Sequence, residues 1–269
     1  MSEQTPAPKK RSPRKKAVAK TVTKAAAGAA APAAPAPLSG PTSEELDRLA
    51  GGAHHDPHSI LGMHPTGDGV VVRALRPGAE RVVARISGEE VPLSHVHAGV
   101  WEAAVPGGEM TDYRLDVTYH GTTYPADDPY RYLPTLGEVD LHLIGEGRHE
   151  QLWTVLGAHV RRYESLNGPV TGVSFAVWAP NARGVRVIGD FNGWDGSSHP
   201  MRVLGSSGVW ELFVPDIGAG THYKFAILGQ DGAWREKADP MARRTEVPPL
   251  TASVVDDSDY TWNDDAWLE

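Results

Sequence analysis

Short stretches of alternating apolar and polar residues, bounded by Gly and Pro, fill two parts of this chain. In one such stretch Val173, Phe175 and Val177 share a side, and in another Tyr223 and Phe225 do. Alternation with a period of two is typical of a half-buried β-strand. Because no helical pattern interrupts the stretches within either part, the sequence predicts an all-β fold of two tandem immunoglobulin-like sandwiches.

An internal repeat supports this division. Residues 69–130 recur, with altered side chains, at 172–241. Both copies contain Gly-Val-Trp-Glu, at 99–102 and 208–211, and both continue through Val-Pro and a Tyr to Asp-Pro. Self-similarity of this kind indicates two copies of one structural module.

Two helices are predicted outside the sandwiches. Residues 42–45 read as a capping box that begins a short helix, which ends at Gly51. The apolar residues of 152–163 recur every three or four positions, which predicts an amphipathic helix joining the modules. The predicted organisation is a disordered tail (1–41), the first sandwich with its helix (42–148), the connecting helix (149–168), the second sandwich (169–256) and the start of a linker (257–269).

The net charge of −8 conceals a basic N-terminus. Residues 1–40 contain eight Lys or Arg and one acidic residue, and they are otherwise rich in Ala and Pro. Such a segment cannot bury enough apolar surface to fold, and we interpret it as a spacer rather than a nucleic-acid-binding arm, because no aromatic residue accompanies the charge. The chain has no cysteine and no long apolar run, so we expect a cytoplasmic protein without membrane contact.

Sequence motifs of catalysis and metal binding are missing. The chain has no cysteine nucleophile, nucleophile elbow, zinc-binding helix or phosphate-binding loop. Four histidines lie between 54 and 64, but Pro57 breaks the helical spacing that a metal site would use, so we interpret them as a turn. We therefore expect no catalytic residue, no metal and no cofactor.

The strongest candidate for a binding site is the loop Gly-Asp-Phe-Asn-Gly-Trp-Asp, residues 189–195. An indole in a polar loop is unfavourable unless a partner covers it, and the C–H face of a sugar ring is a natural partner for Trp194. Lys224, which points away from its buried aromatic neighbours, and Trp234 in the next turn can join it. In the alternative, Trp194 packs under the sheet edge and Lys224 extends along the surface. Residue types alone leave both open.

Six segments, in order, resemble the N-terminal part of bacterial glycogen branching enzymes. They are DPHSILGMH (56–64), LGAH (156–159), FAVWAPNA (175–182), GDFNGWD (189–195), GVWELFV (208–214) and KADP (237–240). The resemblance implies two N-terminal sandwiches, the second a family 48 carbohydrate-binding module. It also implies a following catalytic barrel that cuts α-1,4 glucan chains and rejoins them through α-1,6 bonds.

The resemblance also implies which residues bind. Trp194, Lys224 and Trp234 would stack on and hydrogen-bond an α-glucan such as glycogen. Asn192 belongs to the same motif, and Thr251 resembles a polar contact from a late strand. The implied partners are α-glucan and a separate catalytic barrel.

The first module departs from this pattern. It lacks the Phe-Asn-x-Trp of the second, although Arg114 aligns with Lys224 and Tyr124 falls near Trp234. We therefore expect the two modules to bind glucan unequally.

Two other functions stay open at this point. Both sandwiches can be scaffold modules that dock on a barrel or another subunit through the faces of Trp178 and Trp210. A debranching enzyme or a kinase-associated glycogen-targeting module is a further alternative, against which the tandem repeat argues.

The sequence ends at Glu269, where the resemblance places the start of the barrel. We expect the purified chain to show no branching activity, because it lacks the family's nucleophilic Asp and cannot form a covalent glycosyl intermediate. Amylose incubated with the chain and stained with iodine measures this. A spectral shift caused by new branch points would contradict the expectation.

Overall fold

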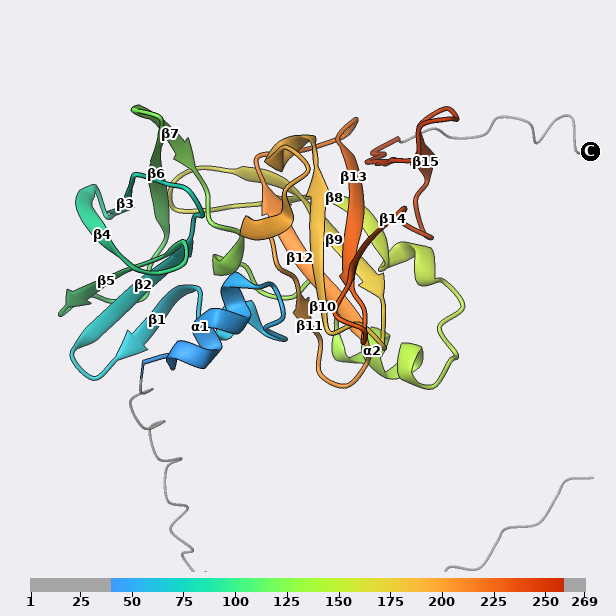
Figure 1. Ribbon diagram of the computed structural model, residues 1–269, viewed down its shortest axis with the longest axis horizontal. Helices are drawn as coiled ribbons and strands as arrows, with labels where there is room; N and C mark the ends of the chain where they lie inside the picture. The colour runs from blue at the N-terminus through green and yellow to red at the C-terminus, as the bar shows by residue number, and fades with distance from the viewer. Residues whose placement is uncertain (1–39, 259–269) are drawn as a thin grey trace, which may run out of the picture. The chain divides into compact units, whose positions relative to one another are not determined.

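The computed structural model describes residues 40–258 (Figure 1). The predicted tail, except for its last two residues, and most of the predicted linker at 257–269 lie outside the described residues. Within 40–258 the chain consists of antiparallel strands with two short α-helices, which confirms the predicted all-β class.

The first module is one seven-stranded sheet in the order β1-β2-β5-β4-β3-β6-β7. Strand β4 connects its two halves, since residues 89–93 pair with β3 and residues 94–97 pair with β5, with a register shift between His95 and His97. A bulge bends a sheet, and strands of both halves supply one hydrophobic core. The elements are α1 (Ser43–Ala50), β1 (Gly62–Thr66), β2 (Gly69–Leu75), β3 (Arg81–Ile86), β4 (Glu89–His97), β5 (Val100–Pro106), β6 (Tyr113–Tyr119) and β7 (Thr122–Ala126), with 3₁₀ turns at Pro57–Ser59 and Pro129–Arg131.

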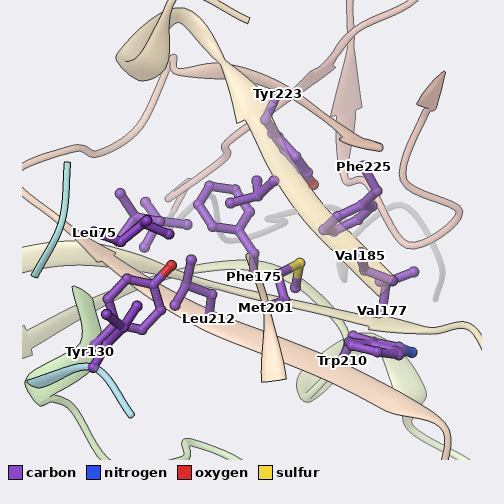
Figure 2. Packing of buried hydrophobic residues seen from close by; sticks show 14 of the residues in the cluster. Leu75, Tyr130, Phe175, Val177, Val185, Met201, Trp210, Leu212, Tyr223 and Phe225 are labelled. Atoms are coloured by element: carbon purple, nitrogen blue, oxygen red, sulfur yellow. The ribbon is translucent and has the colours of Figure 1, made fainter. Parts of the chain in front are cut away.

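The second module is a sandwich of two sheets. One has the order β11-β12-β9-β8, and the other has the order β10-β13-β16-β15, with β14 also paired to β13. Phe175 and Leu212 from the first sheet share a core with Val185, Tyr223 and Phe225 from the second (Figure 2). The elements are β8 (Gly157–Tyr163), β9 (Val170–Trp178), β10 (Gly184–Gly189), β11 (Arg202–Val203), β12 (Val209–Pro215), β13 (His222–Leu228), β14 (Trp234–Lys237), β15 (Arg244–Thr245) and β16 (Ser253–Val254), with 3₁₀ turns at Asp190–Asn192 and Gly196–Ser198.

The predicted helices had different outcomes. Thr42 caps α1 through the predicted capping box. The predicted connecting helix at 149–168 is wrong, because the helix between the modules is α2 (Glu138–Gly145) and residues 157–163 form strand β8. A 3₁₀ turn at Leu152–Thr154 lies between them. Strand β9 offers a free edge to which β8 binds along its whole length, and such pairing overrides a weak helical spacing.

The two modules place their repeated tryptophans in equivalent positions. The indole of Trp101 donates to the carbonyl of Arg76, and the indole of Trp210 donates to the carbonyl of Ala179. Both side chains are buried. Trp210 therefore belongs to the core and cannot form part of the docking face considered from the sequence. Trp178, the other tryptophan considered there, is exposed.

The repeated Tyr and Asp-Pro residues also meet in space. The Tyr113 hydroxyl donates to Asp128 at 2.5 Å, and the Tyr223 hydroxyl donates to Asp239 at 2.5 Å. Burial raises the pKa of both carboxyl groups. The hydrogen bond from the tyrosine satisfies a carboxyl that each module buries.

The two modules share a hydrophobic contact. Leu75 and Tyr130 of the first module belong to the same buried cluster as Leu212 of the second, and Figure 2 shows the three together. The Tyr130 hydroxyl lies 3.1 Å from the carbonyl oxygens of Ser198 and Pro200, to which it donates. The junction is thus both apolar and specifically hydrogen-bonded.

A buried ion pair lies beside this contact. Glu211 accepts hydrogen bonds from Arg202 Nε and Nη2 at 3.0 and 2.8 Å. It also accepts from the backbone N–H and the hydroxyl of Thr135, both at 2.9 Å. Arg202 donates in addition to the carbonyl of Tyr132 at 3.3 Å. Both charges are therefore satisfied, and they tie the segment between the modules to the second sandwich.

We expect Glu211→Ala to lower the free energy of unfolding by about 3–5 kcal/mol, because Arg202 would stay buried without its partner. Chemical denaturation of the whole chain measures the loss. Arg162→Ala is the matched control, since it removes an exposed pair with Asp257 at 3.1 Å and should change stability by less than about 1 kcal/mol. Similar losses in the two variants would contradict the role given to Glu211.

Candidate functional site

The side chain of Asn192 holds the loop that follows β10. Its Oδ1 accepts from the Gly189 N–H at 2.9 Å, and its Nδ2 donates to the Val187 carbonyl at 3.0 Å. The same Nδ2 lies 3.2 Å from Nδ1 of His199. Both ends of the amide are thus used within the protein, so Asn192 shapes the loop, and its contact with a sugar stays a prediction.

The loop displays Trp194 in an unusual conformation. Its φ is +64°, in the left-handed region that large side chains rarely adopt. A hydrogen bond from its N–H to the Gly189 carbonyl at 2.9 Å holds it there, and 39% of the residue is exposed. The residue is therefore partly exposed. Strained backbone of this kind is concentrated at functional sites.

Lys224 and Asp190 lie beside Trp194. The Lys224 Nζ is 5.8 Å from the centroid of the indole and 3.7 Å from the carboxylate of Glu236. Asp190 accepts from the Trp194 side chain and from the backbone N–H and Nδ1 of His222, the latter two at 3.1 and 2.8 Å. Burial opposes ionisation of Asp190, but these hydrogen bonds outweigh it and hold the pKa below its usual value. The site thus offers an aromatic ring with donors and acceptors at its edge.

Trp234 is held by an arginine that the sequence did not single out. The Arg186 guanidinium carbon lies 4.4 Å from the centroid of the Trp234 ring. Its Nη2 donates to the carbonyl of Ala50, the last residue of α1, at 3.3 Å. Burial lowers the pKa of Arg186. The stack orients the indole, of which more than a third stays exposed, and α1 of the first module supports it.

Strand register places these groups on one face of the second module. Residues paired directly across antiparallel strands, and residues two apart, point to the same side of the sheet. The pairs concerned are Lys224 with Ile188, Ala226 with Arg186, and Leu228 with Trp234. Leu228, which pairs with Trp234, lies four residues along β13 from Lys224, a distance of about 13 Å. We call the surface formed by Trp194, Lys224 and Trp234 the sugar face.

Thr251 lies apart from these three residues. It is exposed and precedes β16, whose Ser253 pairs with Tyr223, the neighbour of Lys224. Within residues 40–258 no hydrogen bond or ring contact joins Thr251 to the sugar face. Its part in binding stays a prediction.

The first module lacks an equivalent face. Arg114, the counterpart of Lys224, forms an ion pair with Asp127 at 2.7 Å. The connection from β3 to β4 is only the two residues Ser87 and Gly88, so no loop exists there to display an indole. Tyr124 is exposed on the edge strand β7.

The histidines at 54–64 form a packed turn. His58 is buried against Tyr130, with ring centroids 5.1 Å apart, and burial holds its pKa well below the usual value. His54 stacks on His55. In residues 40–258 no group of three or more potential ligand side chains is arranged to hold a metal ion. The same stretch contains no helix with the length and apolar character to span a bilayer.

Comparison with known families assigns each module separately. Residues 42–130 match the N-terminal domain of the alpha-1,4-glucan branching enzyme GlgB. Residues 155–242 match carbohydrate-binding module 48, the isoamylase N-terminal domain. The second match covers the whole sugar face.

Curated relatives agree with both matches. The chain is 62% identical over 229 residues to the 1,4-alpha-glucan branching enzyme GlgB of Rhodococcus jostii (strain RHA1). It is 61% identical over 226 residues to that of Nocardia farcinica and 60% identical over 234 residues to that of Thermobifida fusca. These alignments cover 84–86% of this chain and 30–31% of the relatives, so the chain spans about a third of their length.

We expect acid to destabilise the fold through His199, which braces the site loop. Burial lowers the pKa of His199 to about 3, below the value of about 6.5 in the unfolded chain. Between these values the unfolded state binds the proton more strongly, so stability falls as the pH falls from 6.5. Unfolding free energies measured from pH 7 to 4 should fall less steeply in His199→Gln, by up to about 1.4 kcal/mol per pH unit. Parallel curves for the two proteins would contradict this.

Proposed function

Because the chain belongs to the N-terminal region of the GlgB branching-enzyme family, with a family 48 carbohydrate-binding module as its second sandwich, we propose that it binds α-glucan through the sugar face. The observation that carries the proposal is the exposed Trp194 with its positive φ. Its conformation costs about 1 kcal/mol or more, and its large apolar side chain is left partly exposed to water. Ligand binding explains why a tryptophan is found there.

The groups around Trp194 suit a neutral sugar. An indole packs against the C–H side of a pyranose ring, which buries apolar surface without removing the hydroxyls from hydrogen-bond partners. Lys224 can donate to hydroxyl oxygens, and Glu236, which is 3.7 Å from it, can accept from a neighbouring hydroxyl. The strand position opposite Trp234 lies about 13 Å from Lys224. Trp234 therefore provides a second ring for a later sugar unit of the same glucan.

We extend the proposal to partners and location. The relatives that carry the branching-enzyme name are about three times as long as this chain, so we propose that the modules hold glycogen near a catalytic barrel that cuts and rejoins it. The protein would then act in the cytoplasm on stored glucan.

A docking role for the second module is the alternative, and one observation favours it. Trp178 is 55% exposed at a mostly apolar pocket of about 400 Å³ that Leu156 and Met241 also line. An exposed apolar pocket is typical of a contact surface. This surface is separate from the sugar face, so the two roles can be tested independently.

We expect Trp194→Ala and Trp234→Ala each to weaken binding of maltoheptaose by about 2- to 13-fold, because each loses an aromatic contact of about 0.5–1.5 kcal/mol. Calorimetric titration measures the affinity. Trp178→Ala is the matched control, since it removes an exposed indole of the same module and should leave the affinity unchanged.

We expect Trp194→Gly to separate binding from folding. This variant lacks the indole, so it should bind as weakly as Trp194→Ala. Because glycine adopts a φ of +64° freely, it should melt at the same temperature as the parent or slightly higher. If it binds maltoheptaose like the parent and melts lower, Trp194 is a structural residue and the docking role is favoured.

A further inference from the structure

A cleft of about 630 Å³ lies at the junction of the two modules. The first module contributes Tyr119 and Tyr124 to its lining, and the second contributes Asp195, His199 and Asp216. We call it the junction cleft. Its volume is in the range of sites that hold small ligands, and it is separate from the sugar face, since Trp194, Lys224 and Trp234 do not line it.

The charges in the junction cleft disfavour an anionic ligand. Among the described residues that line it, the arginine or lysine present is Arg76, which is buried and donates to the carbonyls of Leu75 and Asp127 at 2.9 and 3.1 Å. Asp195 and Asp216 line it with exposed side chains, and Arg114, which does not line the cleft, lies 4.0 Å from the Asp216 carboxylate. A phosphate or carboxylate would thus meet two carboxylates, and the one cation among these lining residues is already bonded to backbone carbonyls.

The same lining suits a neutral, hydroxyl-rich ligand. Tyr124 is 54% exposed on the edge strand β7. Tyr119 is half-buried at the end of β6, where it pairs with Thr122 of β7. Phenol rings can pack against the C–H face of a pyranose. The carboxylates of Asp195 and Asp216, which also line the cleft, can accept hydrogen bonds from sugar hydroxyls.

His199 adds an uncharged polar group. Its Nδ1 lies 3.2 Å from the Asn192 amide and 2.9 Å from the Ser198 hydroxyl, which can both donate to it. Its pKa of about 3 keeps the ring neutral at physiological pH, so it adds no positive charge to the cleft. His199 is one of the residues that line the cleft.

We propose that the junction cleft is a second α-glucan site, which takes a short malto-oligosaccharide segment between the two modules. The choice of an α-linked sugar rests on the proposed function, whereas the neutral polyol class follows from the cleft itself. The loop at 190–199 contributes Trp194 to the sugar face and Asn192, Asp195 and His199 to the cleft. One braced loop therefore contributes to both sites.

Maltotriose titrated calorimetrically into the whole chain tests the proposal. We expect two binding sites in the parent and one in the double variant Trp194→Ala/Trp234→Ala, which lacks both indoles of the sugar face. Adding Tyr124→Ala to that double variant should weaken the remaining binding by about 2- to 13-fold, as expected for one aromatic contact. Thr122→Ala, on the same exposed strand but outside the cleft, should leave it unchanged.

A second cleft variant tests whether Tyr124→Ala weakens binding only because it disturbs folding. Asp216 has a φ of +62°, so Asp216→Gly removes the carboxylate without straining the backbone and should also weaken the remaining binding. If the Trp194/Trp234 double variant binds no maltotriose, or if neither Tyr124→Ala nor Asp216→Gly weakens its binding, the second site is refuted while the sugar face stands. If the double variant binds with the parent's stoichiometry and affinity and Tyr124→Ala removes all binding, the sugar face is wrong and the junction cleft is the site.

Discussion

The packing of Tyr130 between the two modules is the contact on which the rest of the arrangement depends. Its ring lies in the cluster that contains the core of the second sandwich, and its hydroxyl donates to the segment before β11. A phenol that is buried at one end and hydrogen-bonded at the other fixes both distance and orientation. Glu211 accepts hydrogen bonds from Thr135, and Arg202 donates to the carbonyl of Tyr132, so the segment between the modules is tied to the second sandwich as well.

This junction gives the first module a role beside the sugar face even though it lacks the loop with Trp194. Helix α1 belongs to the first module, yet its last carbonyl accepts from Arg186, which stacks on Trp234. A Cβ on Gly52 would lie 2.2 Å from Arg186 Nε, so the chain after α1 approaches as closely as a glycine allows. A change in the first module can therefore reach a ring of the second through packed atoms alone.

The sequence predicts part of the candidate site and misses part. Trp194 and Lys224 are 30 positions apart, and their proximity was expected from the resemblance and from the outward position of Lys224. Arg186 was missed because nothing local distinguishes an outward arginine on a strand from any solvated one. Only the pairing of β10 with β13 and β14, and the position of α1, bring it over the Trp234 ring.

The repeat shows what the sequence determined by itself. Gly99 and Gly208 both have positive φ, and a Cβ on either would clash with Pro77 or Pro180 of its own module, so the turn before Val-Trp-Glu needs glycine in both copies. Local turn chemistry and period-two alternation thus determined two β-modules with the same turn before the repeated tryptophan. Tertiary structure alone decided that residues 157–163 form β8, because a strand at the free edge of β9 gains hydrogen bonds that do not depend on neighbours in sequence. It also decided how the modules meet, since that contact joins side chains whose spacing along the chain carries no signal.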